Sequence, residues 1–462
     1  MNLNRLSLYG WVASLSLAGP AGAGGAESQT VRVDLRLRTG GIVSGLVVDH
    51  DDHALVIVRE GTPYVFSWRE MELSSALAAR KAAVSVSLRG HQELSANDHF
   101  ALGQLALNQD RADLAALEFR KAEKLEKDFA PRIREAFSVY RQAKATATDD
   151  LIEDWEPDEV QAEDDSPSAD RRTQPDLPTL ASEDVRVQLF DAYHRFGAKV
   201  QEVLGKDVVL LESEHFLIWT DWEPKLRDRL AAWCEAMYAA LCERFEVGRG
   251  ELIFPAKCPV FCFRSKARFR KFARHFDGYD GVSALGYTRS IERHGHVHVA
   301  LLRAGKTAAD FDQFACTLVH EGTHAFLHRL FEHRLIPHWI NEGYAELTSE
   351  RVLGDRCDAG ETAALLARQY ARYDWSLNGL FERTSEIDVH EYPLAHSIVA
   401  YLEDFGRSKG ARFIRALKEG RTAASALADA YDGLTPAQLE AAWRLANRLP
   451  RVESAVPPRA TE

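Results

Sequence analysis

The chain carries the run Leu318-Val319-His320-Glu321-Gly322-Thr323-His324-Ala325-Phe326-Leu327, whose apolar residues have the spacing of a buried helix. Two histidines four residues apart lie on the same face of a helix, so His320 and His324 can bind one metal ion together. Glu321 lies next to them, where its carboxylate can accept a proton from a water molecule on that ion. The run therefore predicts a metal site built on a helix.

A second run, Trp339-Ile340-Asn341-Glu342-Gly343, has the pattern of another helix start and places Glu342 eighteen residues after His324. Glu342 offers a carboxylate as the third ligand, and Glu346, one turn further on, can orient a ligand imidazole. Three protein ligands and a water molecule are the composition of a catalytic zinc site, whereas a structural site has four protein ligands. The alternative is that these residues only pack or form hydrogen bonds. That alternative leaves adjacent ionisable groups on an apolar helix unexplained.

The two motifs, His320-Glu321-Gly322-Thr323-His324 and Asn341-Glu342-Gly343-Tyr344-Ala345-Glu346, resemble those of the gluzincins, the thermolysin-like metallopeptidases. The resemblance covers residues 205–445 and implies an α+β zincin-like domain, a zinc cofactor and a polypeptide substrate. The metzincin pattern is absent, because Leu327 and Leu330 stand where its glycine and third histidine would be. The resemblance implies the zinc ligands His320, His324 and Glu342, the general base Glu321 and a supporting carboxylate, Glu346.

The group that would stabilise an oxyanion has two candidates. Members of this family use a Tyr or a His from beyond the ligands, and here Tyr392 and His396 precede a helix expected at residues 398–405. Tyr392 is the first choice and His396 the second, although an ordinary packing role suits each of them equally well. Five further histidines are expected in the cleft or on the surface and not as ligands. They are His328 and His338, together with His294, His296 and His298, which alternate along an expected edge strand.

The chain length of 462 residues predicts more than one domain. The formal net charge of -12 comes almost entirely from residues 149–165, which contain ten Asp or Glu residues and no Lys or Arg. The rest of the chain is close to neutral, and this argues against a basic surface for nucleic acid. Six cysteines are too few for a disulfide scaffold, so we expect buried free thiols.

Residues 1–26 have the pattern of a signal peptide. Arg5 precedes a modest apolar run at residues 6–17, and Ala21-Gly22-Ala23 or Ala26 offers a cleavage point. An ordinary apolar N-terminus is the alternative, and an uncleaved anchor is also open. No later run is long and apolar enough to span a membrane. We therefore expect a secreted or periplasmic protein without an integral span once the signal is removed.

Residues 30–72 alternate apolar and polar residues in short segments with tight turns. They predict four or five strands in a small all-β barrel similar to the Sm-like barrels. Residues 73–144 predict an α-helical region that includes a hairpin, with the spacing of one tetratricopeptide repeat. The sequence is equally consistent with a hairpin that only packs against the rest of the protein and with a hairpin that binds a protein partner. The repeat-like positions are His99, Leu102-Gly103, Ala106, Ala115, Phe119 and Ala122.

Residues 145–182 are acidic and rich in Ser, Pro and Thr, so they predict a disordered linker, with a binding tail as the alternative. Residues 183–450 predict a mixed sheet packed against the motif helix, and residues 451–462 a flexible tail. The helices are expected at residues 185–204, 226–245 and 266–276, the strands at residues 208–211, 215–220, 259–263 and 294–302, and a Gly-rich loop at residues 278–286.

These features lead to three hypotheses. The first is an exported zinc metallopeptidase with Glu321 as general base. The second is a binding or scaffold protein that uses its barrel and repeat-like modules while the zincin-like fold is catalytically idle. The third is a zinc hydrolase that acts on a bond other than a peptide bond.

Overall fold

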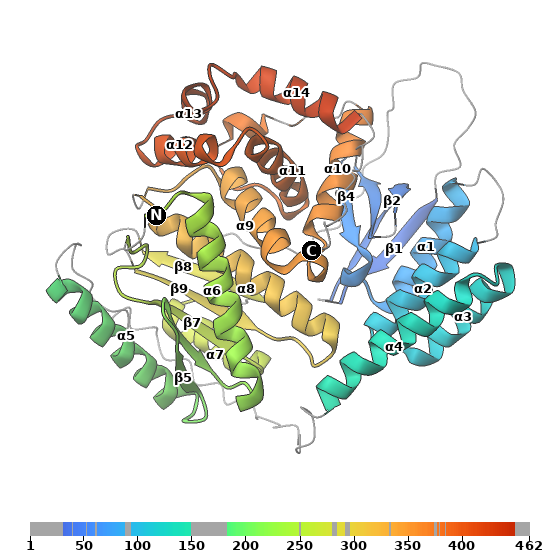
Figure 1. The fold of residues 1–462 in the computed structure, drawn as a ribbon, viewed down its shortest axis with the longest axis horizontal. Coiled ribbons are helices and arrows are strands. Elements are labelled where there is room, and N and C mark those ends of the chain that lie inside the picture. The colour runs from blue at the N-terminus through green and yellow to red at the C-terminus, as the bar shows by residue number, and fades with distance from the viewer. Residues whose placement is uncertain are drawn as a thin grey trace, which may run out of the picture. The chain divides into compact units, whose positions relative to one another are not determined.

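The computed structural model describes residues 31–38, 40–51, 53–60, 62–87, 94–148, 183–248, 251–279, 284–291, 296–331, 334–373, 377, 379–383 and 385–448. The chain divides into two compact units (Figure 1), Met1–Ala106 with Arg111–Ile133 and Leu107–Asp110 with Arg134–Glu462. The expected signal peptide, residues 149–182 of the expected linker and the C-terminal tail lie outside the described residues.

The first unit begins with an antiparallel sheet whose strands pair in chain order. Val33 and Leu35 are buried while their neighbours in the first strand are exposed, which is the alternation that the sequence predicts. Leu37, just after the first strand, pairs with Met71, just after the last one. The antiparallel sheet is confirmed, while its identification as an Sm-like barrel stays a prediction. The strands are β1 (Arg32–Arg36), β2 (Ile42–His50), β3 (Ala54–Arg59) and β4 (Thr62–Ser67), followed by η1 (Trp68–Glu70).

Two of the helices that follow form a tight hairpin. A Cβ on Gly103 would come within 2.4 Å of the Phe119 ring, so the helices approach closely only because residue 103 has no side chain. The ring centroids of Phe100 and Phe119 are 5.3 Å apart. The last helix runs to Thr148, beyond the expected boundary at residue 144. The helices are α1 (Leu73–Ser87), α2 (Ala96–Asn108), α3 (Ala112–Leu125) and α4 (Phe129–Thr148), of which residues 134–148 belong to the second unit.

The second unit is organised around a five-stranded mixed sheet in the order β5-β6-β7-β9-β8. The three inner strands are parallel to one another, and each edge strand is antiparallel to its neighbour. All seven residues of the strand beside the β8 edge are buried, which shows that both of its faces are covered. The strands are β5 (Val209–Glu212), β6 (Phe216–Thr220), β7 (Cys258–Phe263), β8 (Gly286–Ile291) and β9 (His296–Leu302).

Helices cover both faces of this sheet. On one face, α5 (Glu183–Leu204) and α7 (Lys266–Asp277) enclose an apolar core that includes Phe196, Phe261 and Phe272. On the other face lie α6 (Pro224–Arg244) and α8 (Ala308–Arg329), which also contact each other. The α8 helix carries the first motif, so the motif lies between the sheet and the helices that follow in the chain.

Those helices form a second layer on α8. The α9 helix (His338–Leu353) contacts both α8 and α11 (Tyr392–Glu403), and α10 (Ala359–Tyr373) contacts α11 and α14. The α11 helix begins at Tyr392, earlier than the expected residue 398. The remaining elements are α12 (Arg407–Lys418), α13 (Ala423–Ala430), α14 (Pro436–Arg448), η2 (Gly354–Arg356), η3 (Leu380–Glu382) and η4 (Val389–Glu391).

Two expectations about the sheet are wrong. Residue 286 does not end a loop but starts β8, a strand that the sequence did not indicate. This strand takes the edge, so β9 is an inner strand and not the edge strand. His296 and His298 on β9 are accordingly buried, each with 1% of its surface exposed, and do not lie at the surface or in a cleft.

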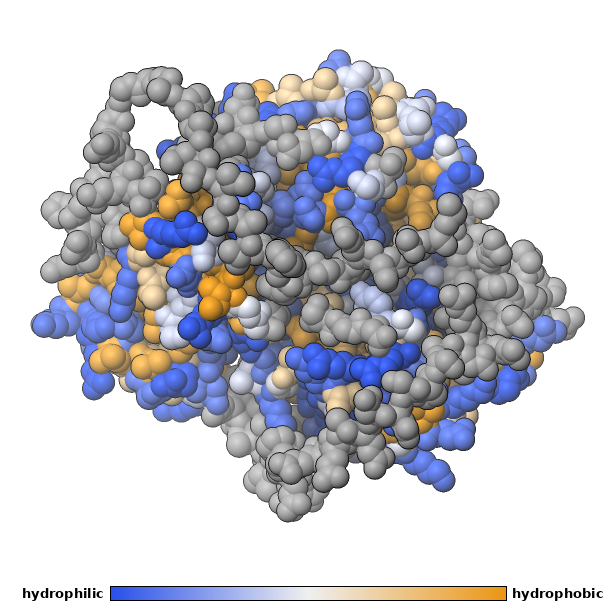
Figure 2. All heavy atoms as spheres, turned by 180° about the vertical axis from the view of Figure 1, so that it is seen from behind, coloured by the Kyte–Doolittle hydropathy of each residue, from blue (hydrophilic) through white to orange (hydrophobic). Residues whose placement is uncertain are grey.

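Figure 2 shows groups of hydrophobic residues interspersed with hydrophilic ones among the described parts of the face that it draws. Among the described residues, no helix is both long and apolar enough to cross a membrane. All six cysteines are free, as expected, but two of them, Cys242 and Cys316, are only partly buried.

Candidate metal centre

A side-chain cap on α8 and a glycine in each motif position the two motif helices. The Thr307 hydroxyl and the Asp310 carboxylate form a reciprocal capping box at the start of α8. Gly322 in the first motif faces Met237 of α6, and a Cβ there would come within 2.4 Å of the Met237 sulfur. Gly343 in the second motif faces α11, and a Cβ there would come within 2.6 Å of the Ala395 carbonyl oxygen. Each motif glycine therefore allows a close helix–helix contact.

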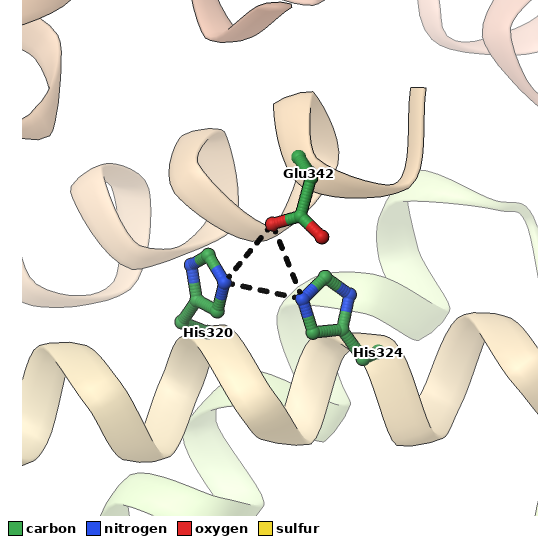
Figure 3. Close-up of side chains that lie close together, drawn as sticks. All are labelled: His320, His324 and Glu342. Atoms are coloured by element: carbon green, nitrogen blue, oxygen red, sulfur yellow. Dashed lines mark hydrogen bonds and ion pairs between the residues drawn. The ribbon is translucent and has the colours of Figure 1, made fainter. Parts of the chain in front are cut away.

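His320 and His324 of α8 and Glu342 of α9 bring three ligand atoms together (Figure 3). The two Nε2 atoms are 3.1 Å apart. Glu342 Oε2 lies 3.3 Å from His320 Nε2 and 3.5 Å from His324 Nε2. The three atoms thus form a nearly equilateral triangle that two separate helices contribute to.

This triangle fits a zinc ion. Bonds of about 2.0–2.1 Å at tetrahedral angles place ligand atoms about 3.3–3.4 Å apart, within the range of the three distances here. Buried Glu342 Oε2 also accepts no hydrogen bond of normal geometry from the residues that the structure describes. A buried carboxylate oxygen without a donor is costly, and a cation between it and the two imidazoles would satisfy it. The donor set of two imidazoles and one carboxylate is a common zinc set.

The charges of these groups are strongly coupled. Burial lowers the pKa of His320, but the adjacent negative charges of Glu342 and Glu346 outweigh burial and raise that pKa well above its usual range. Burial raises the pKa of Glu342, but the two imidazoles outweigh it and hold this pKa below its usual range. The site is therefore built to keep a carboxylate ionised inside the protein, which needs positive charge beside it.

Two further side chains contact the ligands from behind. Glu346 Oε1 lies 3.0 Å from His320 Nδ1, so it can orient that imidazole with Nε2 facing the triangle. This is the position that the sequence predicts for it. His338 Nε2 lies 3.2 Å from Glu342 Oε1, a contact that the sequence reasoning missed. Its signal was the spacing of four residues between His338 and Glu342 on one helix.

Glu321 has a partner on the edge strand. The Thr288 hydroxyl of β8 lies 2.9 Å from Glu321 Oε2 and 2.6 Å from the Glu321 carbonyl oxygen, and its one proton serves one of them at a time. A Cβ on Gly286 would come within 3.2 Å of Glu321 Cγ. Thr288 thus fixes the expected general base from outside α8. No sequence signal connected this threonine with the motif.

The two candidates for the oxyanion donor lie in different surroundings. The ring of Tyr392 is parallel to that of His320, with centroids 6.2 Å apart, so Tyr392 lies beside the triangle. Burial and nearby carboxylates, Glu342 foremost, raise the pKa of Tyr392, which keeps its hydroxyl protonated as a donor. His396 Nε2 instead lies 2.7 Å from Glu350 Oε2. Glu350 is two turns beyond Glu342 on α9, roughly 12 Å along the axis, so this placement favours Tyr392.

Three of the other histidines named from the sequence, His296, His298 and His328, are buried in other parts of the second unit. His298 is bonded to His296 and to Asp277 in the core behind the sheet, with nitrogen–nitrogen and nitrogen–oxygen distances of 2.8 and 3.1 Å. His328 is buried at the end of α8, so the expectation that it lies in the cleft or at the surface is wrong. His294 lies outside the described residues.

A second group of side chains has ligand atoms close enough together to bind a cation. It consists of Asp388, His390 and Glu391. Here the two carboxylates have other roles, because they form a capping box at η4 and Glu391 also bonds Arg383 at 2.7 Å. The triangle on α8 and α9 is accordingly the better metal site among the described residues.

Comparison with the models of known protein families gave no match to the chain, and comparison with curated proteins gave none either. The geometry of the site is therefore the basis for assigning a function.

Proposed function

We propose that this protein is a zinc-dependent hydrolase that cleaves peptide bonds in polypeptides. The observation that carries the proposal is the triangle of His320 Nε2, His324 Nε2 and Glu342 Oε2, with sides of 3.1–3.5 Å. These three residues would hold a zinc ion and would leave a position on it for a water molecule, as in catalytic zinc sites. The gluzincin-like motifs support the same proposal.

When bound, zinc would lower the pKa of a water molecule to about 7 and polarise the carbonyl group of the substrate. Glu321, held by Thr288, would accept the proton of the attacking water and return it to the leaving amine. Tyr392 would donate a hydrogen bond to the oxyanion from beside His320. Glu346 would keep His320 oriented throughout.

The test combines metal analysis with a cleavage profile across a proteome. We expect one zinc per chain in the wild type and in Glu321→Gln, and loss of zinc in His320→Ala. Glu321→Gln should lower hydrolysis by about 10²- to 10⁴-fold, because the proton acceptor is lost while the ligands remain. Full hydrolysis of every substrate by Glu321→Gln would refute the peptidase proposal.

A scaffold role is the second candidate, and the α2–α3 hairpin favours it. Its close contact of Gly103 with Phe119 matches the small-to-large packing of a tetratricopeptide repeat. Substoichiometric zinc together with unchanged partner binding in His320→Ala would support this role over catalysis. Export rests on residues 1–26 alone, and N-terminal sequencing of the protein from its natural source tests it.

A further inference from the structure

The two carboxylate oxygens of Glu342 have different surroundings. Oε2 completes the triangle with the imidazoles of His320 and His324. Oε1 points elsewhere and lies 3.2 Å from Nε2 of His338, which is one turn earlier on α9. A carboxylate can bind a cation through one oxygen or through both. The contact to His338 therefore bears on how Glu342 binds.

A backbone amide fixes the tautomer of His338. The N–H of Ile387 donates to His338 Nδ1 at 3.2 Å, so Nδ1 accepts and carries no proton. In a neutral imidazole the proton is then on Nε2, the atom that faces Glu342 Oε1. His338 is thereby set to donate a hydrogen bond to the carboxylate.

The surroundings also hold the imidazole in place. Its ring centroid is 6.3 Å from that of Tyr392, and 26% of the side chain is exposed. The segment before η4 supplies the Ile387 amide, α11 supplies Tyr392, and α9 carries both His338 and Glu342. Contacts from three segments thus restrict the rotation of one side chain.

We propose that His338 is a positioning residue that holds Glu342 as a ligand through one oxygen. This inference rests on the proposed zinc site. With Oε1 engaged by His338, only Oε2 would bind a zinc ion, and one position on the ion would remain for water and substrate. Without the donor, Oε1 is free to rotate toward the same point and crowd that position. Partners behind a ligand commonly affect metal affinity in this way.

Three substitutions separate the two contacts of His338. His338→Asn retains an acceptor near Nδ1 for the Ile387 amide but is too short to donate to Glu342. His338→Gln reaches as far as Nε2 and keeps the donor. His338→Leu removes both contacts. His275→Asn on α7 is the matched control, because His275 is exposed and far along the chain from the motifs.

The measurement is zinc affinity by competition with a chromogenic chelator, with circular dichroism as a check of folding. We expect His338→Asn and His338→Leu to weaken zinc binding by about 10- to 100-fold, while His338→Gln keeps most of the affinity. The visible spectrum of the cobalt(II)-loaded protein should change in the first two variants and resemble the wild type in the third.

Equal zinc affinity in the wild type and His338→Asn, with loss in His320→Ala, would overturn this inference and leave the zinc site intact. A glutamine variant as weak as the leucine variant would also overturn it. A wild-type protein that takes up no zinc would instead refute the proposed function, and the role of His338 with it.

Discussion

At the scale of single residues, the site combines side chains that would bind the metal ion with side chains that hold these ligands in place. Oxygens and nitrogens that point into the triangle come from His320, His324 and Glu342, and the atoms on their far sides contact Glu346 and His338. The far-side partners fix tautomers and rotamers, so the ligand atoms need little rearrangement before they bind a cation. Glu321 is supported in the same manner, from a strand and not from its own helix.

Substitution of Thr288 tests that support. Thr288→Val keeps the shape but removes the hydroxyl that contacts Glu321 Oε2 at 2.9 Å. We expect kcat to fall by about tenfold, as for loss of one hydrogen bond to a charged group, with zinc content unchanged. Thr288→Ser should restore activity. Thr317→Val is the control, because its hydroxyl bonds the Gln313 carbonyl oxygen within α8. A similar loss in Thr317→Val would argue against a specific role for Thr288.

At the scale of elements, the site depends on how closely α9 approaches α8 on one side and α11 on another. The sequence indicated the motif helices because helical spacing is a local property. It did not indicate β8, whose residues Gly286-Tyr287-Thr288-Arg289-Ser290-Ile291 mix polar and apolar types without clear alternation. The order of strands is also absent from local pattern, so the placement of β9 at the edge was wrong. Contacts such as Thr288 with Glu321 arise only from tertiary packing.

Substitution of each motif glycine by alanine should show which of the two helix contacts can adjust to an added methyl group. In Gly343→Ala the new methyl group meets the Ala395 carbonyl oxygen at 2.6 Å, and backbone cannot move aside easily. We expect the free energy of unfolding to fall by about 1–3 kcal/mol in urea denaturation. In Gly322→Ala the obstacle is the flexible end of Met237, so the loss should be smaller. The opposite ranking of the two variants would contradict this account of the helix contacts.

At the scale of the whole molecule, sequence and structure agree where information is local and differ where it is not. The antiparallel sheet near the N-terminus, the two motif helices and the mixed character of the sheet in the second unit followed from periodicity and turn residues. The three residues of the triangle were named from the spacing within and between two motifs. His338 was taken for a cleft or surface residue, because a donor to Glu342 is recognised only when the direction of both side chains is known.

Metal removal tests the stability of the second unit, because the triangle joins α8 to α9 within it. A ligand that binds only the folded state stabilises it by RT ln(1 + [L]/Kd), about 2.7 kcal/mol when free zinc is 100 times Kd. We therefore expect the melting temperature of the second unit to rise with zinc and to fall after chelation. His320→Ala should show no such dependence on zinc, since it lacks one corner of the triangle. A melting temperature that zinc raises equally in wild type and His320→Ala would place the stabilising metal elsewhere in the chain.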